Sequence, residues 1–144
     1  MIKLIHRIGQ SIFMRLEGAL NGIFGTALNP FYYLGAITYF MFWIIVVSGF
    51  YIYAFYDTGV DDALNSVESL TNRQWYLGGI MRSLHRYASD GMILAAILHM
   101  LRNFVFDRYR NFRWFSWYTG VAVLWLVYMA GINGYWLVWD KLAQ

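Results

Sequence analysis

Two histidines, His85 and His99, stand fourteen residues apart in one largely apolar stretch of the sequence. In an α-helix, fourteen residues rise about 21 Å and bring the two side chains to within about 40° of the same direction. An imidazole can relay protons or bind a metal through a ring nitrogen. Because the ligands of one zinc ion must lie far closer than about 21 Å, the pair predicts two separate sites on one helix face.

Two arginines bracket the histidine pair. Arg82 precedes His85 by three residues, and Arg102 follows His99 by three residues. At helical spacing both lie near the histidine face and are displaced outward from the pair. Guanidinium groups bind carboxylates well, so these arginines are where two stacked cofactors with carboxylate groups would need cations.

Two glycine pairs repeat the fourteen-residue interval. They are Gly35 with Gly49 and Gly120 with Gly134. Glycine leaves room where a flat cofactor meets a helix, and two stacked plates need such gaps at the spacing of their ligands. The three pairs together favour two hemes. Taken singly, a glycine pair is typical of close membrane-helix packing, and a histidine pair is typical of packing or of a proton relay.

The composition is that of a membrane bundle. The chain has 144 residues, of which 60% are hydrophobic, 21% aromatic and only 13% charged, whereas soluble domains carry about 25% charged residues. The net charge of +3 is too small and too dispersed to indicate nucleic-acid binding. The absence of cysteine excludes disulfides, cysteine-ligated iron–sulfur clusters and thioether-bound heme within this chain.

The hydrophobic pattern predicts one all-α membrane domain over residues 1–144. An amphipathic helix over 1–28 is expected in the membrane interface. Its histidine, His6, is expected at the surface or in the interface, with a ligand role as the alternative. Transmembrane helices are expected over 30–56, 75–106 and 114–139, because about 20 apolar residues span the hydrocarbon core. Asn29-Pro30 marks the first helix start, and a short interfacial helix is expected in the acidic loop that follows the first span.

The charges of the loops predict the orientation. The N-terminus and the loop from Asp107 to Arg113 are basic, whereas the loop from Asp57 to Arg73 is acidic. Basic segments stay on the cytoplasmic side, which places the N-terminus and His99 inside and His85 near the outer side. We therefore expect an integral protein of the bacterial inner membrane, with a thylakoid-type membrane as the alternative.

Four motifs resemble cytochrome b of the quinol–cytochrome c reductases and of the photosynthetic bf complexes. They are RSLHRY at 82–87, HMLR at 99–102, NPFYYLGAIT at 29–38 and GINGYWLVWD at 131–140. The resemblance covers nearly the whole chain and is closest to the short, split form of the bf type.

The resemblance assigns roles to the spaced residues. It implies that His85 is an axial ligand of an outer, low-potential heme b and that His99 is one of an inner, high-potential heme b. Arg82 and Arg102 would pair with heme propionates. The end of the third span, around Tyr135, would border the outer quinol pocket, and the residues that would make room for the porphyrins are Gly35, Gly49, Gly120 and Gly134.

Three departures from the family pattern matter. The split form carries a cysteine that holds an extra heme, and Tyr33 stands at the matching position, which excludes covalent attachment. The family's Pro-Trp after the third span reads Val138-Trp139. The family also takes its second axial ligands from a fourth helix, and His6 is the only other histidine here. The sequence is then a piece of a longer protein, or another chain supplies that helix, or the hemes are single-ligated or absent.

The function implied is that of a diheme cytochrome b subunit that carries electrons across the membrane between quinol-oxidising and quinone-reducing sites. The implied partners are the remaining cytochrome b helices or a second membrane chain, an iron–sulfur protein, a cytochrome c-type acceptor, quinone and lipid, in a dimeric complex. Two alternatives stay open: a heme b membrane anchor of a quinone-linked dehydrogenase or reductase, and a non-redox structural or transport bundle.

Overall fold

The computed structural model describes residues 2–59, 62–74 and 76–138. These residues form α-helices and short 3-10 turns without strands, so the predicted all-α class is confirmed for the described part of the chain. The elements in order are α1 (Ile2–Phe24), η1 (Pro30–Tyr32), α2 (Leu34–Phe55), α3 (Ala63–Asn72), α4 (Gly78–Val105), η2 (Asn111–Arg113) and α5 (Trp114–Trp136).

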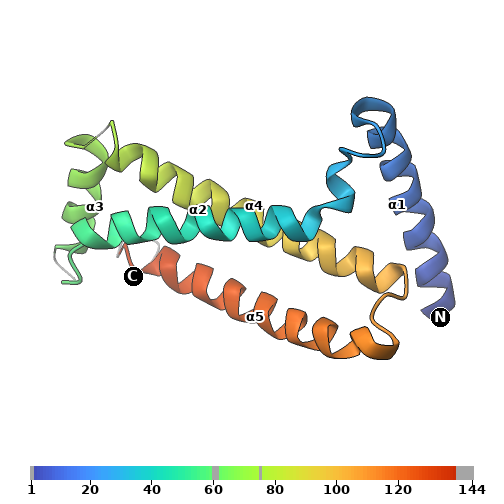
Figure 1. Cartoon of the computed structure of the whole chain (residues 1–144). Coiled ribbons are helices and arrows are strands. Elements are labelled where there is room, and N and C mark those ends of the chain that lie inside the picture. Colours follow the sequence, from blue (N-terminus) through green and yellow to red (C-terminus); the bar gives the residue numbers. More distant parts are fainter. Residues whose placement is uncertain (1, 60–61, 75, 139–144) are drawn as a thin grey trace.

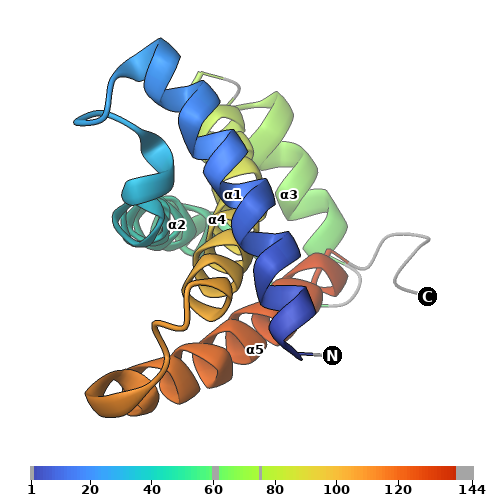
Figure 2. The same cartoon turned by 90° about the vertical axis from the view of Figure 1, so that its right-hand side faces the viewer.

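Three long helices run beside one another and form the body of the molecule. Figure 1 shows α2 and α4 in contact along their length and α5 below them, with α3 at one end and α1 at the other. Figure 2 shows that α1 lies across the end of the bundle rather than along it. With 22, 28 and 23 residues, the long helices measure about 33, 42 and 35 Å, enough to cross a hydrocarbon core of about 30 Å.

Two segments are long and apolar enough to cross a membrane, Leu34–Phe55 and Asn111–Trp136. Their mean hydropathies are 1.8 and 1.5, and few or none of their residues are fully buried within the chain. Helix α4 lies against α2 but carries Arg82, Arg86 and Asp90 among its residues, which lowers its hydropathy. The second predicted span, over 75–106, therefore stays a prediction.

The helix ends differ from the predicted ones by a few residues. The segment over 30–56 divides into η1 and α2, and that over 75–106 is helical from Gly78 to Val105. The helix α5 ends at Trp136, and residues 75 and 139 lie outside the described ranges. The short helix expected in the acidic loop is α3.

Asn29 organises the turn between α1 and α2. Its side-chain oxygen accepts a hydrogen bond from the backbone N–H of Phe31 at 2.9 Å, and its amide donates to Glu17 O at 3.1 Å and to Asn21 Oδ1 at 2.7 Å. The residue is completely buried. Because Pro30 needs no N–H partner at the start of a helical turn, the Asn-Pro pair sets the entry to α2, as predicted.

Helix α1 is attached to the C-terminal end of α4 by close contacts. A Cβ on Gly9 would lie 2.7 Å from Val105 Cγ2, so only glycine permits this approach. The Gln10 amide donates to Val105 O at 3.0 Å. Farther along, Arg102 Nε donates to Glu17 Oε1 at 2.7 Å, and the two side chains are 11% and 12% exposed. A charged contact this well buried fixes α1 across the bundle.

The prediction that His6 lies on the surface is wrong. His6 is 7% exposed, and its ring meets Phe104 edge-on with centroids 4.9 Å apart. Its Nδ1 lies 3.5 Å from Asp107 Oδ1. The sequence pattern of α1 alone does not reveal this site, because the neighbours of His6 come from the far end of α4.

Replacing Glu17 with Gln should loosen α1. Removing one partner of a buried ion pair costs about 3 kcal/mol, which is about a hundredfold in an opening equilibrium. Hydrogen exchange of the α1 amides in the purified protein should therefore accelerate by up to this factor, and Arg102→Gln added to Glu17→Gln should restore part of the protection.

The exposed Arg15, which joins no ion pair among the described residues, gives the matched control Arg15→Gln. Equal exchange rates in Glu17→Gln and Arg15→Gln would contradict a structural role for the ion pair.

Candidate cofactor site

Both histidines of α4 lie directly against the glycine pair of α2. A Cβ on Gly35 would lie 3.0 Å from His99 Cε1, and a Cβ on Gly49 would lie 3.1 Å from His85 Cε1. Because the first glycine meets the second histidine, α2 and α4 are antiparallel. The matching fourteen-residue intervals put both pairs in register. Any larger side chain at either glycine would push an imidazole away.

His85 is held in one tautomer. His85 Nδ1 lies 3.2 Å from the carbonyl oxygen of Ile45, which can only accept a hydrogen bond. It also lies 3.1 Å from Ser48 Oγ, whose own hydrogen is donated to Ile44 O at 2.6 Å. Both contacts call for a proton on Nδ1. The free electron pair is then on Nε2, as a metal-ligating imidazole requires.

His99 has different surroundings. The amide nitrogen of Asn103 lies 3.2 Å from His99 Nε2 and donates to the backbone oxygen of His99 at 3.0 Å. The Asn103 amide therefore stands beside the nitrogen that would bind a metal, and it must rotate aside for a ligand to approach. The His99 side chain is exposed within this chain, whereas that of His85 is half-buried.

A pocket of about 690 Å³ opens beside His99, between α2, α4 and α5. It brings together three predicted residues from three helices, Gly35, His99 and Gly120. The end of the pocket that is farther from the α4–α5 loop is apolar, and the end of the pocket toward that loop is polar and basic. The lining also includes Met92, Asn103, Arg108, Arg113, Ser116, Trp117 and Val127.

The two predicted arginines have other partners in this structure. Arg82 is exposed, and its Nη1 donates to Thr71 Oγ1 at 2.9 Å. Arg102 is paired with Glu17, with its guanidinium 5.3 and 5.5 Å from the ring centroids of Tyr32 and Phe106. Arg102 does not line the pocket beside His99.

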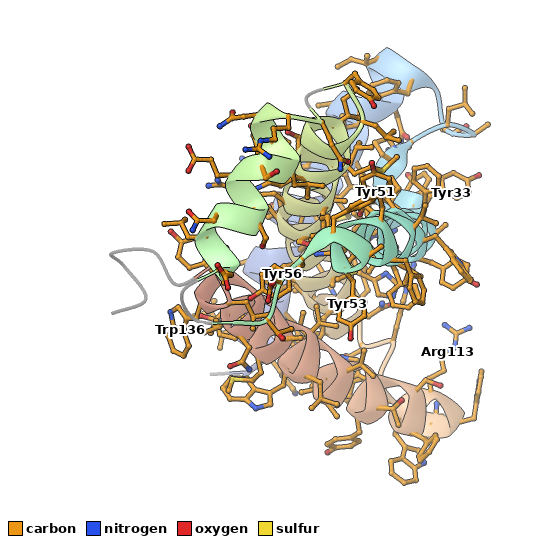
Figure 3. All side chains as sticks on the ribbon, turned by 90° about the vertical axis from the view of Figure 1, so that its left-hand side faces the viewer. Tyr33, Tyr51, Tyr53, Tyr56, Arg113 and Trp136 are labelled. Atoms are coloured by element: carbon orange, nitrogen blue, oxygen red, sulfur yellow. The ribbon has the colours of Figure 1, made fainter. Side chains whose placement is uncertain are left out.

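Only one of the predicted residues of α5 lies in the pocket beside His99. Gly120 and Gly134 face open space, since a Cβ on either would meet no heavy atom within 4 Å. Gly120 lines the pocket, but Gly134 does not. Tyr135 is 52% exposed near the outer end of α5. The ends of α2 and α5 meet there, where Tyr56 donates to the Leu137 carbonyl at 2.7 Å, and Figure 3 shows Tyr56 near Trp136.

Sequence reasoning missed the polar residues of the pocket. Asn103 and Trp117 carried no signal in the sequence, because asparagine and tryptophan are common near membrane-helix ends. In the sequence, the basic loop indicates only the membrane orientation. In the structure, it also supplies Arg108 and Arg113 to the pocket lining. Figure 3 shows Arg113 extending from the start of α5 toward the side on which α2 lies.

These features define a helix bundle with two histidines on one apolar-flanked helix and glycines on the neighbouring helices. A family model described as cytochrome b/b6/petB matches residues 21–144. The chain therefore belongs to the cytochrome b family, the heme-containing electron-transport proteins of membranes.

Curated relatives agree with the family model. Cytochrome b6 of Prochlorothrix hollandica is 36% identical over 115 residues, which is 80% of this chain and 51% of that protein. Cytochrome b6 of Bigelowiella natans is 36% identical over 118 residues, and that of Synechococcus elongatus is 35% identical over 115, with 80% of this chain and 53% of each relative covered. The chain spans about half the length of these relatives.

The residues present fit a heme. At Gly35 and at Gly49, an imidazole lies against the backbone in space that a Cβ would fill. The pocket beside His99 has a volume within the ~300–1,000 Å³ range of cofactor sites. In its wall, the Trp117 ring packs against Phe104 and Tyr109.

Replacing Gly35 with Val should remove heme from the inner site and spare the outer one, whereas Gly49→Val should do the reverse. Each valine pushes an imidazole from its position, and overpacking by a side chain of this size costs about 1–3 kcal/mol, or about 5- to 100-fold in cofactor retention. The heme content and b-type absorbance of the purified complex measure this loss.

Gly91→Ala is the control, because a Cβ there meets only Met41 at 3.9 Å. Full heme occupancy in both valine variants would contradict the glycine cradles.

Proposed function

We propose that this chain is the heme-binding half of a diheme cytochrome b, and that it carries electrons across the membrane between a quinol-oxidising and a quinone-reducing site. The observation that carries the proposal is the register of α2 and α4, in which both histidines lie on glycines at the same interval. A single site would need only one such contact. Two contacts about 21 Å apart suit two redox centres on opposite sides of a membrane.

Each proposed ligand has a distinct task. His85 and His99 each supply an axial imidazole nitrogen, and the contacts of His85 Nδ1 with Ser48 and Ile45 hold that ring in the ligating tautomer. Heme b, when bound, supplies reversible one-electron chemistry whose potential depends on its ligands and burial. Binding is non-covalent, since the chain has no cysteine.

The remaining site residues position the porphyrins. The α2 glycines admit the two imidazoles, and the α5 glycines leave open space on the opposite side. Arg82 is proposed to bind a propionate of the outer heme, for which it must exchange its hydrogen bond with Thr71. The matching prediction for Arg102 stays a prediction, because its guanidinium is paired with Glu17. The four glycines of this proposal are Gly35, Gly49, Gly120 and Gly134.

The second axial ligands are proposed to come from outside residues 1–144. Among the described residues, His6 is the only other histidine, and it is buried between α1 and the end of α4. A fourth helix with its own histidine pair, from the same protein or from another membrane chain, would complete the bundle against the exposed faces of α2 and α5.

The wider assembly follows from this role. We propose an iron–sulfur protein and a cytochrome c-type acceptor as redox partners, quinone as the substrate and a dimeric complex. Tyr135, exposed near the outer end of α5, would border the outer quinone site. With α4 as the second of three spans and the N-terminus cytoplasmic, His99 lies on the inner side of a bacterial membrane, or of a thylakoid-type membrane in the alternative.

Replacing each histidine separately should remove one redox component at a time. His85→Ala should abolish the lower-potential b-type component, and His99→Ala the higher-potential one, because each variant loses an axial ligand of one center. A potentiometric titration of the b-type absorbance in membranes measures both components. His6→Ala is the matched control and should retain both.

Wild-type membranes without a b-type heme band, or a single component unaffected by either substitution, would contradict the diheme proposal.

A further inference from the structure

An acidic residue, Asp90, stands on the outward face of α4. It follows His85 by five residues, which turns its side chain about 140° away from the direction of that histidine. The Asp90 side chain is exposed within this chain. It does not line the pocket beside His99, and the cofactor site makes no use of it.

The packing of α4 on α2 gives the level of Asp90 in the bundle. In the register of these antiparallel helices, the two glycines of α2 lie against the two histidines of α4, which puts Asp90 level with Ile44. Ile44 stands at the middle of Leu34–Phe55, a segment long and apolar enough to cross a membrane. A residue at this level lies near the centre of the hydrocarbon core, about 15 Å from either side.

The side chains around Asp90 on this face of α4 are apolar or aromatic. Tyr87, one turn before Asp90, is 73% exposed, and Leu94, one turn after it, is 61% exposed. Ile97, a further turn along, is 39% exposed. Against lipid tails, a charged carboxylate in such a face would disfavour membrane insertion by about a hundredfold. Asp90 therefore needs a partner that balances its charge.

The described part of the chain supplies no such partner. Its ion pairs use the carboxylates of Asp107 and Glu17, and the hydroxyl next to Asp90 in the sequence, that of Ser89, donates to the His85 carbonyl instead. The nearest cation along α4 is Arg86, one turn closer to the Gly78 end, and it is not ion-paired with Asp90. Because helical side chains lean toward the N-terminus, its guanidinium extends away from the middle of the span.

We propose that the outward face of α4 around Asp90 binds a transmembrane helix of a separate protein chain, and that this helix carries a lysine or arginine level with Asp90. A hydrogen-bonded ion pair would neutralise the carboxylate at a depth where water is absent. Tyr87 and Leu94 would pack on either side of the pair.

This partner differs from the fourth helix of the proposed bundle. The fourth helix is proposed to supply its ligands on the histidine side of α4, whereas Asp90 is turned about 140° from His85. The remaining part of the relatives' length is thus assigned to the histidine side, which leaves the outward side to a separate chain. The inference rests on α4 as the proposed second span and goes beyond the proposed function, because it involves neither heme ligand.

A photo-crosslinking amino acid at Leu94 identifies what faces Asp90. The residue p-benzoylphenylalanine is introduced there in the full complex, native membranes are illuminated, and crosslinked peptides are identified by mass spectrometry. The expected product joins Leu94 to a membrane helix of another chain, with a lysine or arginine within one turn of the crosslinked residue. Crosslinks to lipid alone, to another segment or copy of this protein, or to a helix without such a cation would overturn the inference.

Charge variants test the ion pair itself. Asp90→Asn removes the charge at nearly constant shape and should reduce the amount of partner retained in mild detergent by about tenfold. Asp90→Lys should reduce it further, and changing the identified cation to aspartate in that variant should restore binding. Glu68→Gln is the matched control, since it removes an exposed carboxylate of α3 and should retain the partner at the wild-type level.

The heme content separates this inference from the proposed function. Asp90→Asn should keep both b-type components, because its side chain is turned away from the histidine face. Equal retention of the partner in Asp90→Asn and Glu68→Gln, or loss of heme from Asp90→Asn with the partner retained, would overturn the inference and leave the diheme proposal intact. Absence of b-type heme from the wild-type complex would contradict the proposed function without contradicting the helix contact.

Discussion

The rest of the structure depends on the contact between the imidazoles of α4 and the bare backbone of α2. His99 and His85 lie within 3.0 and 3.1 Å of where a Cβ would stand on Gly35 and Gly49. Such proximity fixes how closely the two helices approach and in which register. In a membrane, where apolar surface gives little drive to helix association, small residues that permit close packing decide which faces meet. The fourteen-residue repeat therefore sets both the packing and the spacing of the two sites.

The inner end of the bundle combines two electrostatic arrangements that serve different purposes. Glu17 and Arg102 neutralise each other in the contact that holds α1 across the bundle. Asp107, in the loop that follows α4, is engaged by His6 of α1 and by Arg110. The two sets of paired charges therefore tie both α1 and the α4–α5 loop to the end of α4.

Much of this arrangement follows from the sequence because it rests on periodicity. The histidine and glycine intervals predicted that these residues share one spacing, but not that Gly35 and Gly49 lie directly against the imidazoles. The apolar runs predicted α2 and α5 to within a few residues. What periodicity misses is contact between distant segments. The burial of His6, the pairing of Arg102 with Glu17 and the position of Arg108 all depend on how α1 and the α4–α5 loop fold back, which no local pattern encodes.

The central claim is that the paired intervals build two cofactor sites, one above the other. An experimentally determined density map of the purified complex tests this most directly. Two planar densities, joined to His85 and His99 and about 21 Å apart along α4, are the result that the account predicts. A single density, or densities that do not reach these two side chains, would contradict it.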